Sequence, residues 1–128
     1  MNTIAENKQV TFQYDPDKKL LLSTYKGIFN FELAKDSYNS IANLYIVGKI
    51  ADVRKLNGSF IKLMSEFKEK YPILKERGLK AEAFVVSDDL MINNLISKLS
   101  KQLEGIGIDT YVCHTVEEAE NWLDNYIS

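Results

Sequence analysis

The sequence predicts one α/β domain over residues 1–128, with a five-stranded mixed sheet and four helices. Two observations support this fold class. From Leu20 onward, strand-like and helix-like segments alternate, which is typical of right-handed β-α-β units and a mainly parallel sheet. A short alternating segment precedes them and pairs back as a hairpin. The predicted sheet therefore has one antiparallel edge strand plus four β-α units.

The composition is that of an ordinary globular domain. Hydrophobic residues make up 45% and charged residues 27%, which is sufficient for a buried core. The formal net charge of −2 gives no general attraction to nucleic acid. One cysteine, Cys113, and one histidine, His114, exclude an internal disulfide and a Cys/His metal cluster. Neither a signal-peptide pattern nor an apolar run of about 18–20 residues occurs, so we expect a cytoplasmic protein.

The first two predicted strands form the hairpin. Val10, Phe12 and Tyr14 alternate with polar residues, as in a strand with one buried face. Residues 15–17, Asp-Pro-Asp, supply turn chemistry. The second strand is predicted over Leu20–Tyr25.

Two helices are predicted in the middle of the chain. The first spans Phe31–Tyr45, because apolar residues recur at helical spacing after Asn30, a suitable N-cap. The second begins near Ser59. Pro72 lacks an amide hydrogen and disfavours a helical conformation at the preceding residue, so a break or kink is predicted there. A last helical segment should then close at Gly78.

Three further strands and two helices complete the domain. Lys49–Val53 is a short strand, Ala81–Val86 a central strand covered on both faces, and Ile106–Cys113 the last strand. Thr115 and Glu118 form a capping box that opens the last helix. The apolar faces of the last two helices comprise Ile92, Leu95, Ile96, Leu99 and Leu103, and Ala119, Trp122, Leu123, Tyr126 and Ile127.

Three segments carry a resemblance that covers nearly the whole chain, from Val10 to Ile127. They are residues 25–27 (Tyr-Lys-Gly), residues 52–54 (Asp-Val-Arg) with Gly58 a few residues on, and residues 117–123 (Glu-Glu-Ala-Glu-Asn-Trp-Leu). In this order they resemble the STAS domain of anti-anti-sigma factors, and more closely the bacterial SpoIIAA-like group. The resemblance implies a SpoIIAA-like domain with a regulatory role. It also implies an apolar ligand as an alternative, because this group resembles lipid-binding CRAL-TRIO domains.

One serine is a candidate modification site. Anti-anti-sigma factors are phosphorylated on a serine in an Asp-Ser-Ser-Gly-type turn at the start of the second helix. In this chain Asp52 matches the aspartate, but the serine pair is absent and Ser59 follows seven residues later. Ser59 is therefore a candidate phosphorylation or anion site, with a simple N-cap as the alternative.

Ligands of open α/β sheets bind at the carboxyl ends of the parallel strands, so a catalytic site would be expected there. Asp88 or Asp89 would serve as a helix cap, which accounts for an acid at that position. Adjacent strand residues point to opposite faces, so Cys113 is expected to be a small buried hydrophobe rather than a partner of His114. No glycine-rich phosphate motif occurs. We therefore expect no enzyme, no cofactor and no metal. The acid–base residues near these strand ends are Asp52, Asp88, Asp89 and His114.

A binding surface is predicted at the same edge of the sheet. Ile61, Leu90 and Met91 lie in the first turns of two helices that follow parallel strands. Ile61 and Leu90 fall outside the apolar faces of their helices, so the three residues are predicted to form an apolar rim. Scattered exposed apolar residues are the alternative. Basic residues between Lys62 and Lys80 suit either an anionic membrane surface or plain solvation.

The expected function is a non-catalytic binding or regulatory module that acts through protein–protein contact. The alternative is a carrier of a lipid or other small apolar ligand with transient membrane association. An enzyme would require Asp52, Asp89 and His114 to gather around a metal. The partner is left open between an unknown protein, a second copy of the chain in a homodimer, and a small apolar ligand. Nucleic acid is excluded as a partner.

Overall fold

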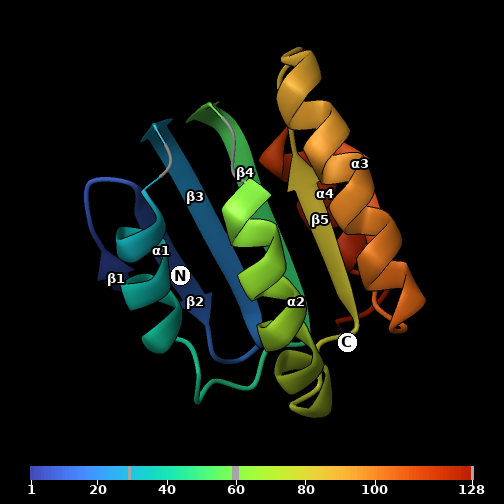
Figure 1. The fold of residues 1–128 in the computed structure, drawn as a ribbon. Helices are drawn as coiled ribbons and strands as arrows, with labels where there is room; N and C mark the ends of the chain where they lie inside the picture. Colours follow the sequence, from blue (N-terminus) through green and yellow to red (C-terminus); the bar gives the residue numbers. More distant parts are fainter. Residues whose placement is uncertain (29, 59–60, 128) are drawn as a thin grey trace.

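The computed structural model describes residues 1–28, 30–58 and 61–127, and the side chains of residues 31, 34 and 61–68 lie outside this description. Six strands form one sheet in the order β1-β2-β3-β4-β5-β6 (Figure 1). β1, β2 and β3 pair antiparallel, and β3 to β6 pair parallel. The strands are β1 (Asn2–Glu6), β2 (Val10–Asp15), β3 (Leu20–Ile28), β4 (Gly48–Asn57), β5 (Ala81–Val85) and β6 (Asp109–Cys113).

The α/β class, the hairpin and the four parallel strands are confirmed, but the five-strand count is wrong. The additional strand is β1, which pairs outside β2. Its apolar residues Ile4 and Ala5 are adjacent rather than alternating, and the register shifts between Thr3 and Ala5. Four of its five residues are exposed, so no apolar periodicity marks it as a strand. β2 is consequently an inner strand and not the edge.

Helices cover the two faces of the sheet unequally (Figure 1). Each of the parallel crossovers moves one strand further in the same direction, and because such crossovers are right-handed, their helices lie on one face. The fourth helix follows the last strand and packs on the opposite face, against β4, β5 and β6. The helices are α1 (Phe31–Asn39), α2 (Ile61–Glu76), α3 (Leu90–Gly105) and α4 (Val116–Leu123).

The first helix is shorter than predicted. α1 begins as expected, with Asn30 accepting a hydrogen bond from the amide of Leu33 at 3.2 Å, but it ends at Asn39. Ile41 stays buried because a tight turn replaces the last helical turns, with its amide donating to the Tyr38 carbonyl at 3.1 Å. Tyr45 is 62% exposed and is not part of the core. The spacing of the apolar residues therefore persisted beyond the end of the helix.

Of the break or kink predicted at Pro72, the break is wrong, because α2 runs through this residue to Glu76. Pro72 removes one backbone hydrogen bond, but its neighbours Tyr71 and Leu74 are buried against the core and hold the segment in place. The predicted stop at Gly78 is confirmed. Gly78 has a positive φ of 112°, and its amide donates to the Lys75 carbonyl at 3.0 Å.

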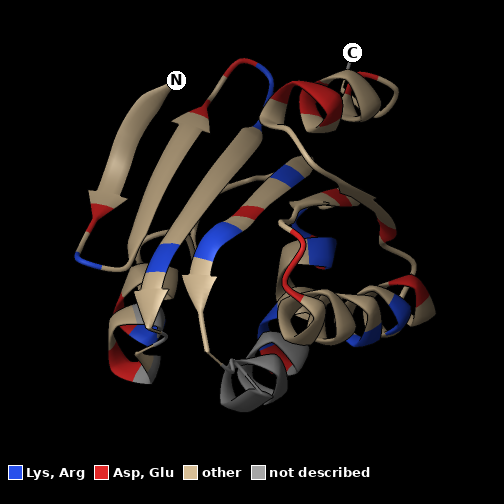
Figure 2. Cartoon of the chain, turned by 90° about the horizontal axis from the view of Figure 1, so that it is seen from above, with Lys and Arg blue, Asp and Glu red and all other residues tan. Residues whose placement is uncertain are grey.

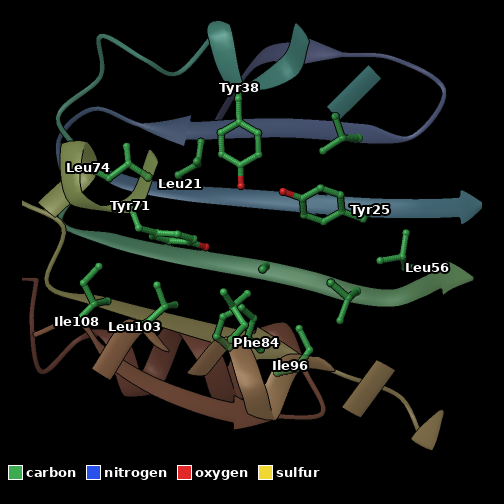
Figure 3. Close-up of a cluster of buried hydrophobic side chains, with 14 of the residues drawn as sticks. Leu21, Tyr25, Tyr38, Leu56, Tyr71, Leu74, Phe84, Ile96, Leu103 and Ile108 are labelled. Carbon is green, nitrogen blue, oxygen red and sulfur yellow. The ribbon is translucent and has the colours of Figure 1, made fainter. Parts of the chain in front are cut away.

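Two apolar cores result, and the larger one lies under α1, α2 and α3 (Figure 3). β5 is buried along its whole length, as predicted for a central strand. Ala119 and Leu123 anchor α4 in the smaller core, and Thr115 caps this helix by accepting from the Glu118 amide at 3.1 Å. The Glu118 carboxylate accepts from the Thr115 hydroxyl, so only half of the predicted capping box is formed. The predicted apolar face of α3 is buried throughout.

Candidate functional site

The parallel strands β3 to β6 end at one edge of the sheet, which we call the carboxyl edge. In open α/β sheets a ligand crevice forms where the strand order reverses and helices leave on opposite faces. Here the strand order follows the chain order without a reversal. The helices after β3, β4 and β5 therefore lie on one face, and these strands provide no switch point of that kind.

The predicted apolar rim is described in part. Leu90 and Met91 lie at the start of α3 on the carboxyl edge, with 78% and 45% of their surfaces exposed. Asp89 caps this helix by accepting from the Ile92 amide at 3.1 Å, so neither Leu90 nor Met91 is needed for the cap. Ile61 begins α2, but its side chain lies outside the described part of the chain. Ser59 also lies outside the described residues.

Three of the four acid–base residues of this edge, Asp52, Asp89 and His114, have separate partners. Arg54 holds Asp52 with two parallel contacts, Nη2 to Oδ2 at 2.8 Å and Nε to Oδ1 at 3.0 Å. Nδ1 of His114 lies 3.2 Å from the Val86 carbonyl oxygen. Among the described residues, no group of three His, Cys, Asp or Glu side chains is placed to hold a metal ion.

Cys113 is a buried member of the smaller core, as predicted. Its Sγ lies 3.6 Å from the Phe84 carbonyl oxygen and 3.5 Å from the Thr115 carbonyl oxygen. Burial raises the pKa of its thiol above the ordinary value of 9.0. The thiolate form that a nucleophile requires is thus disfavoured.

Two strands extend beyond their neighbours at the carboxyl edge, and sequence reasoning missed this. β2 stops pairing with β3 at Tyr25, and β5 stops pairing with β4 at Asp52. β3 and β4 continue together through three more pairs, which we call the ribbon tip: residues 26–28 of β3 and 55–57 of β4. Its terminal residue Ile28 is 82% exposed. The strand predicted over Leu20–Tyr25 continues to Ile28, and Gly27 within it adopts a positive φ of 76°, which glycine allows.

A buried ionic cluster, comprising Lys49, Tyr71 and Glu82, was also missed. The Lys49 Nζ lies 3.4 Å from Glu82 Oε1, and the two side chains are 1% and 0% exposed. The Tyr71 hydroxyl is 2.8 Å from Oε1 and 2.9 Å from Oε2 of the same carboxylate. The cluster ties α2 to the two central strands. The hydroxyl groups of Tyr25 and Tyr38 point toward each other beside it (Figure 3).

The sequence contained a signal for this cluster. Lys49 and Glu82 each occupy the second position of a buried strand, in Gly-Lys-Ile-Ala and Ala-Glu-Ala-Phe. Opposite charges at matching positions of neighbouring apolar strands favour a cross-strand pair, and these two residues are indeed register partners. Burial raises the pKa of the Glu82 carboxyl above its ordinary value of 4.5, and the Lys49 cation opposes this rise. Burial likewise raises the pKa of the Tyr71 hydroxyl well above 10.0.

The Glu82 carboxyl should titrate above pH 4.5 in a carbon-13 NMR experiment. Because the folded state binds this proton more tightly than the unfolded chain, its stabilising contribution is present below pH 4.5 and is lost as the pH rises through the raised pKa. The unfolding free energy of the wild type relative to Glu82→Gln should therefore fall across that window. Glu76→Gln, which changes an exposed acid, is the matched control. A Glu82 titration midpoint at or below 4.5 would contradict the burial effect.

The described hollows lie away from the carboxyl edge. One of about 100 Å³ lies between α1 and α2, and one of about 270 Å³ between α2 and α3. A wide one of about 410 Å³ opens at the opposite edge, beside Lys80 and Asp109. Among the described residues, no helix is long and apolar enough to cross a membrane.

Comparison of the chain with family models, with curated proteins and with solved structures finds no match. Any functional assignment consequently depends on the geometry of the carboxyl edge.

Proposed function

We propose that the chain is a non-catalytic binding or regulatory module of the SpoIIAA-like type, which acts through protein–protein contact at its carboxyl edge. The observation that carries this proposal is the exposure of Leu90, 78%, in the first turn of α3 beside the half-exposed Met91. Large apolar side chains that serve neither a cap nor the core are typical of contact surfaces when they are adjacent. The order of elements from Val10 onward supports the SpoIIAA-like assignment, because it is the order on which the resemblance was based.

The topology favours a contact surface over a ligand cavity. The strand order has no reversal, and a reversal is the feature beside which small ligands bind in open α/β sheets. Pockets for drug-sized ligands usually have volumes of about 300–1,000 Å³ and an apolar lining. Two of the described hollows, of about 100 and 270 Å³, lie below this range. The third, of about 410 Å³, is a wide hollow beside Lys75, Lys80 and Asp109 at the opposite edge of the sheet.

The double substitution Leu90→Ser and Met91→Ser tests the proposed surface. Because both side chains are exposed, the unfolding free energy should change by no more than about 0.5 kcal/mol per site. Loss of one buried aliphatic side chain from an interface should weaken binding to a captured partner more than about tenfold. Affinity is measured by pull-down with quantitative mass spectrometry, followed by titration of the partner identified.

The control for this experiment is Ile73→Ser, which removes an exposed isoleucine from α2. Partners retained by Ile73→Ser and lost by the double variant support the proposal. Strong destabilisation of the double variant would show that Leu90 and Met91 belong to the core. Native mass spectrometry separates the carrier alternative, because a carrier should retain a bound molecule above the chain mass of 14.7 kDa.

A further inference from the structure

The ribbon tip bears an unusual pair of charges. Lys26 and Lys55 are direct register partners on the parallel strands β3 and β4, and both are exposed. Like charges placed opposite each other on adjacent strands repel and weaken the pairing. Among the described residues, neither lysine forms an ion pair with an acid. The tip therefore carries concentrated positive charge at some cost in stability.

Further basic residues adjoin this pair. Figure 2 shows positive charge gathered near the ends of β3 and β4. Arg54 directly precedes Lys55, although its charge is balanced by Asp52. Lys8 lies in the turn between β1 and β2, which is held to the tip because the Lys26 amide donates to the Gln9 carbonyl at 2.8 Å. Residues 26–28 and 55–57 include no acid.

The apex of the same ribbon is apolar. Ile28 is 82% exposed, the largest exposure among the described large apolar side chains. Leu56 on the partner strand is buried in the larger core, so it anchors the tip while Ile28 points into solvent. The described hollows lie between the helices and at the opposite edge of the sheet. The tip is thus a projection with the apolar Ile28 at its end and the basic Lys26 and Lys55 behind it.

A projection of this kind suits a deformable, negatively charged surface. A single isoleucine can enter the boundary between lipid headgroups and acyl chains without a preformed cavity, and lysines beside it attract anionic headgroups. A folded protein partner would instead need a matching pocket for the isoleucine. We propose that the ribbon tip docks the domain on an anionic lipid surface, with Ile28 inserted and Lys26 and Lys55 at the phosphate level. This inference uses residues other than Leu90 and Met91, and it goes beyond the proposed protein contact.

Vesicle co-sedimentation of the intact chain tests the proposal. Wild-type protein should bind vesicles of equal parts phosphatidylcholine and phosphatidylserine, bind vesicles of phosphatidylcholine alone much more weakly, and dissociate as salt screens the charges. Lys55→Glu should weaken binding to the anionic vesicles by more than about fivefold, since each lysine near such a surface contributes about that factor. It should not unfold the protein, because an opposite charge would then face Lys26 across the strands. Ile28→Ser should also weaken binding and leave the thermal midpoint unchanged.

Lys18→Glu is the matched control, because it makes the same charge change in the exposed turn between β2 and β3, at the opposite edge of the sheet. Its affinity for anionic vesicles should stay within about twofold of the wild-type affinity, well short of the roughly fivefold loss expected for a lysine at the lipid surface. Three results would overturn the proposal: equal binding to both vesicle types, undiminished binding by Lys55→Glu, or an equal loss in Lys18→Glu. Binding of the wild type to polyglutamate but not to vesicles would likewise reject the membrane and indicate an acidic protein partner. Leu90→Ser with Met91→Ser should sediment as wild type, which separates this test from that of the protein contact.

Discussion

Lys49→Met should lower the free energy of unfolding by about 3–5 kcal/mol, because it leaves the Glu82 carboxylate buried without its cation. Methionine is apolar and similar in length to lysine, so the packing changes little and the loss of the charge dominates the effect. Tyr71 can still donate to the carboxylate, which limits the penalty. The cost should shrink as the pH is lowered, since protonated Glu82 needs no cation. Urea denaturation at neutral pH measures the difference.

Two further variants show whether the unpaired buried charge causes this loss of stability. In Lys49→Met with Glu82→Met both charges are absent, and most of the lost stability should return, because an apolar pair of similar volume replaces a desolvated ion pair. Lys80→Met removes an exposed lysine next to β5 and should change stability by about 0.5 kcal/mol at most. If Lys49→Met unfolds at the wild-type urea concentration, the cluster contributes nothing to stability.

Leu123→Ala should cost about 2–5 kcal/mol, as truncation of a buried leucine does when the cavity cannot collapse. Leu123 is completely buried under α4. It reaches the sheet at Gly48, where an added Cβ would stand 3.2 Å from Leu123 Cδ2 and 3.1 Å from Ile127 Cδ1. This close approach means that the helix and β4 are fitted to each other. The denaturant midpoint gives the loss directly.

Gly48→Ala provides a sharp control for that prediction. In the wild-type background the added methyl group is tight against Leu123 and should destabilise slightly. In the Leu123→Ala background the same methyl group enters the cavity, so Gly48→Ala should restore part of the stability. Equal effects of Gly48→Ala in both backgrounds would show that the two positions do not share a packing site.

The predictable parts of the fold are the elements in which burial of one or both faces fixes the spacing of apolar residues along the chain. The central strand Ala81–Val85 and the buried face of α3 were predictable from the sequence, because each position in them faces either the core or the solvent. β1 could not be predicted, since an exposed edge strand such as Asn2–Glu6 needs no apolar alternation. At Pro72 and Tyr45 the local sequence was misleading. The proline indicated a break or kink in the helix, and helical spacing of apolar residues continued to Tyr45. Tertiary packing overrode both local preferences.

The candidate site was predictable to the extent that it depends on chain order. Leu90 and Asp89 were placed at the start of a helix after a parallel strand, where the structure has them. The exposure of Ile28 could not be predicted, because it depends on how far β3 extends beyond β2. The length over which two strands pair cannot be inferred from the sequence of one strand. Opposite charges at matching positions of two apolar strands indicate that Lys49 and Glu82 could pair, but the pairing itself depends on which strands are neighbours and on their register, which one sequence does not supply.

Because the strand order follows the chain order, each strand contacts the strand made just before it. Each new pairing therefore closes a loop that contains no more than one turn or one helix, which keeps the entropy cost of each closure small. Growth in one direction also places β1 and β6 at opposite margins of the sheet (Figure 1). A label on β1 and another on β6 would therefore lie at opposite margins of the sheet, which makes such a pair suitable for reporting the width of the sheet by energy transfer.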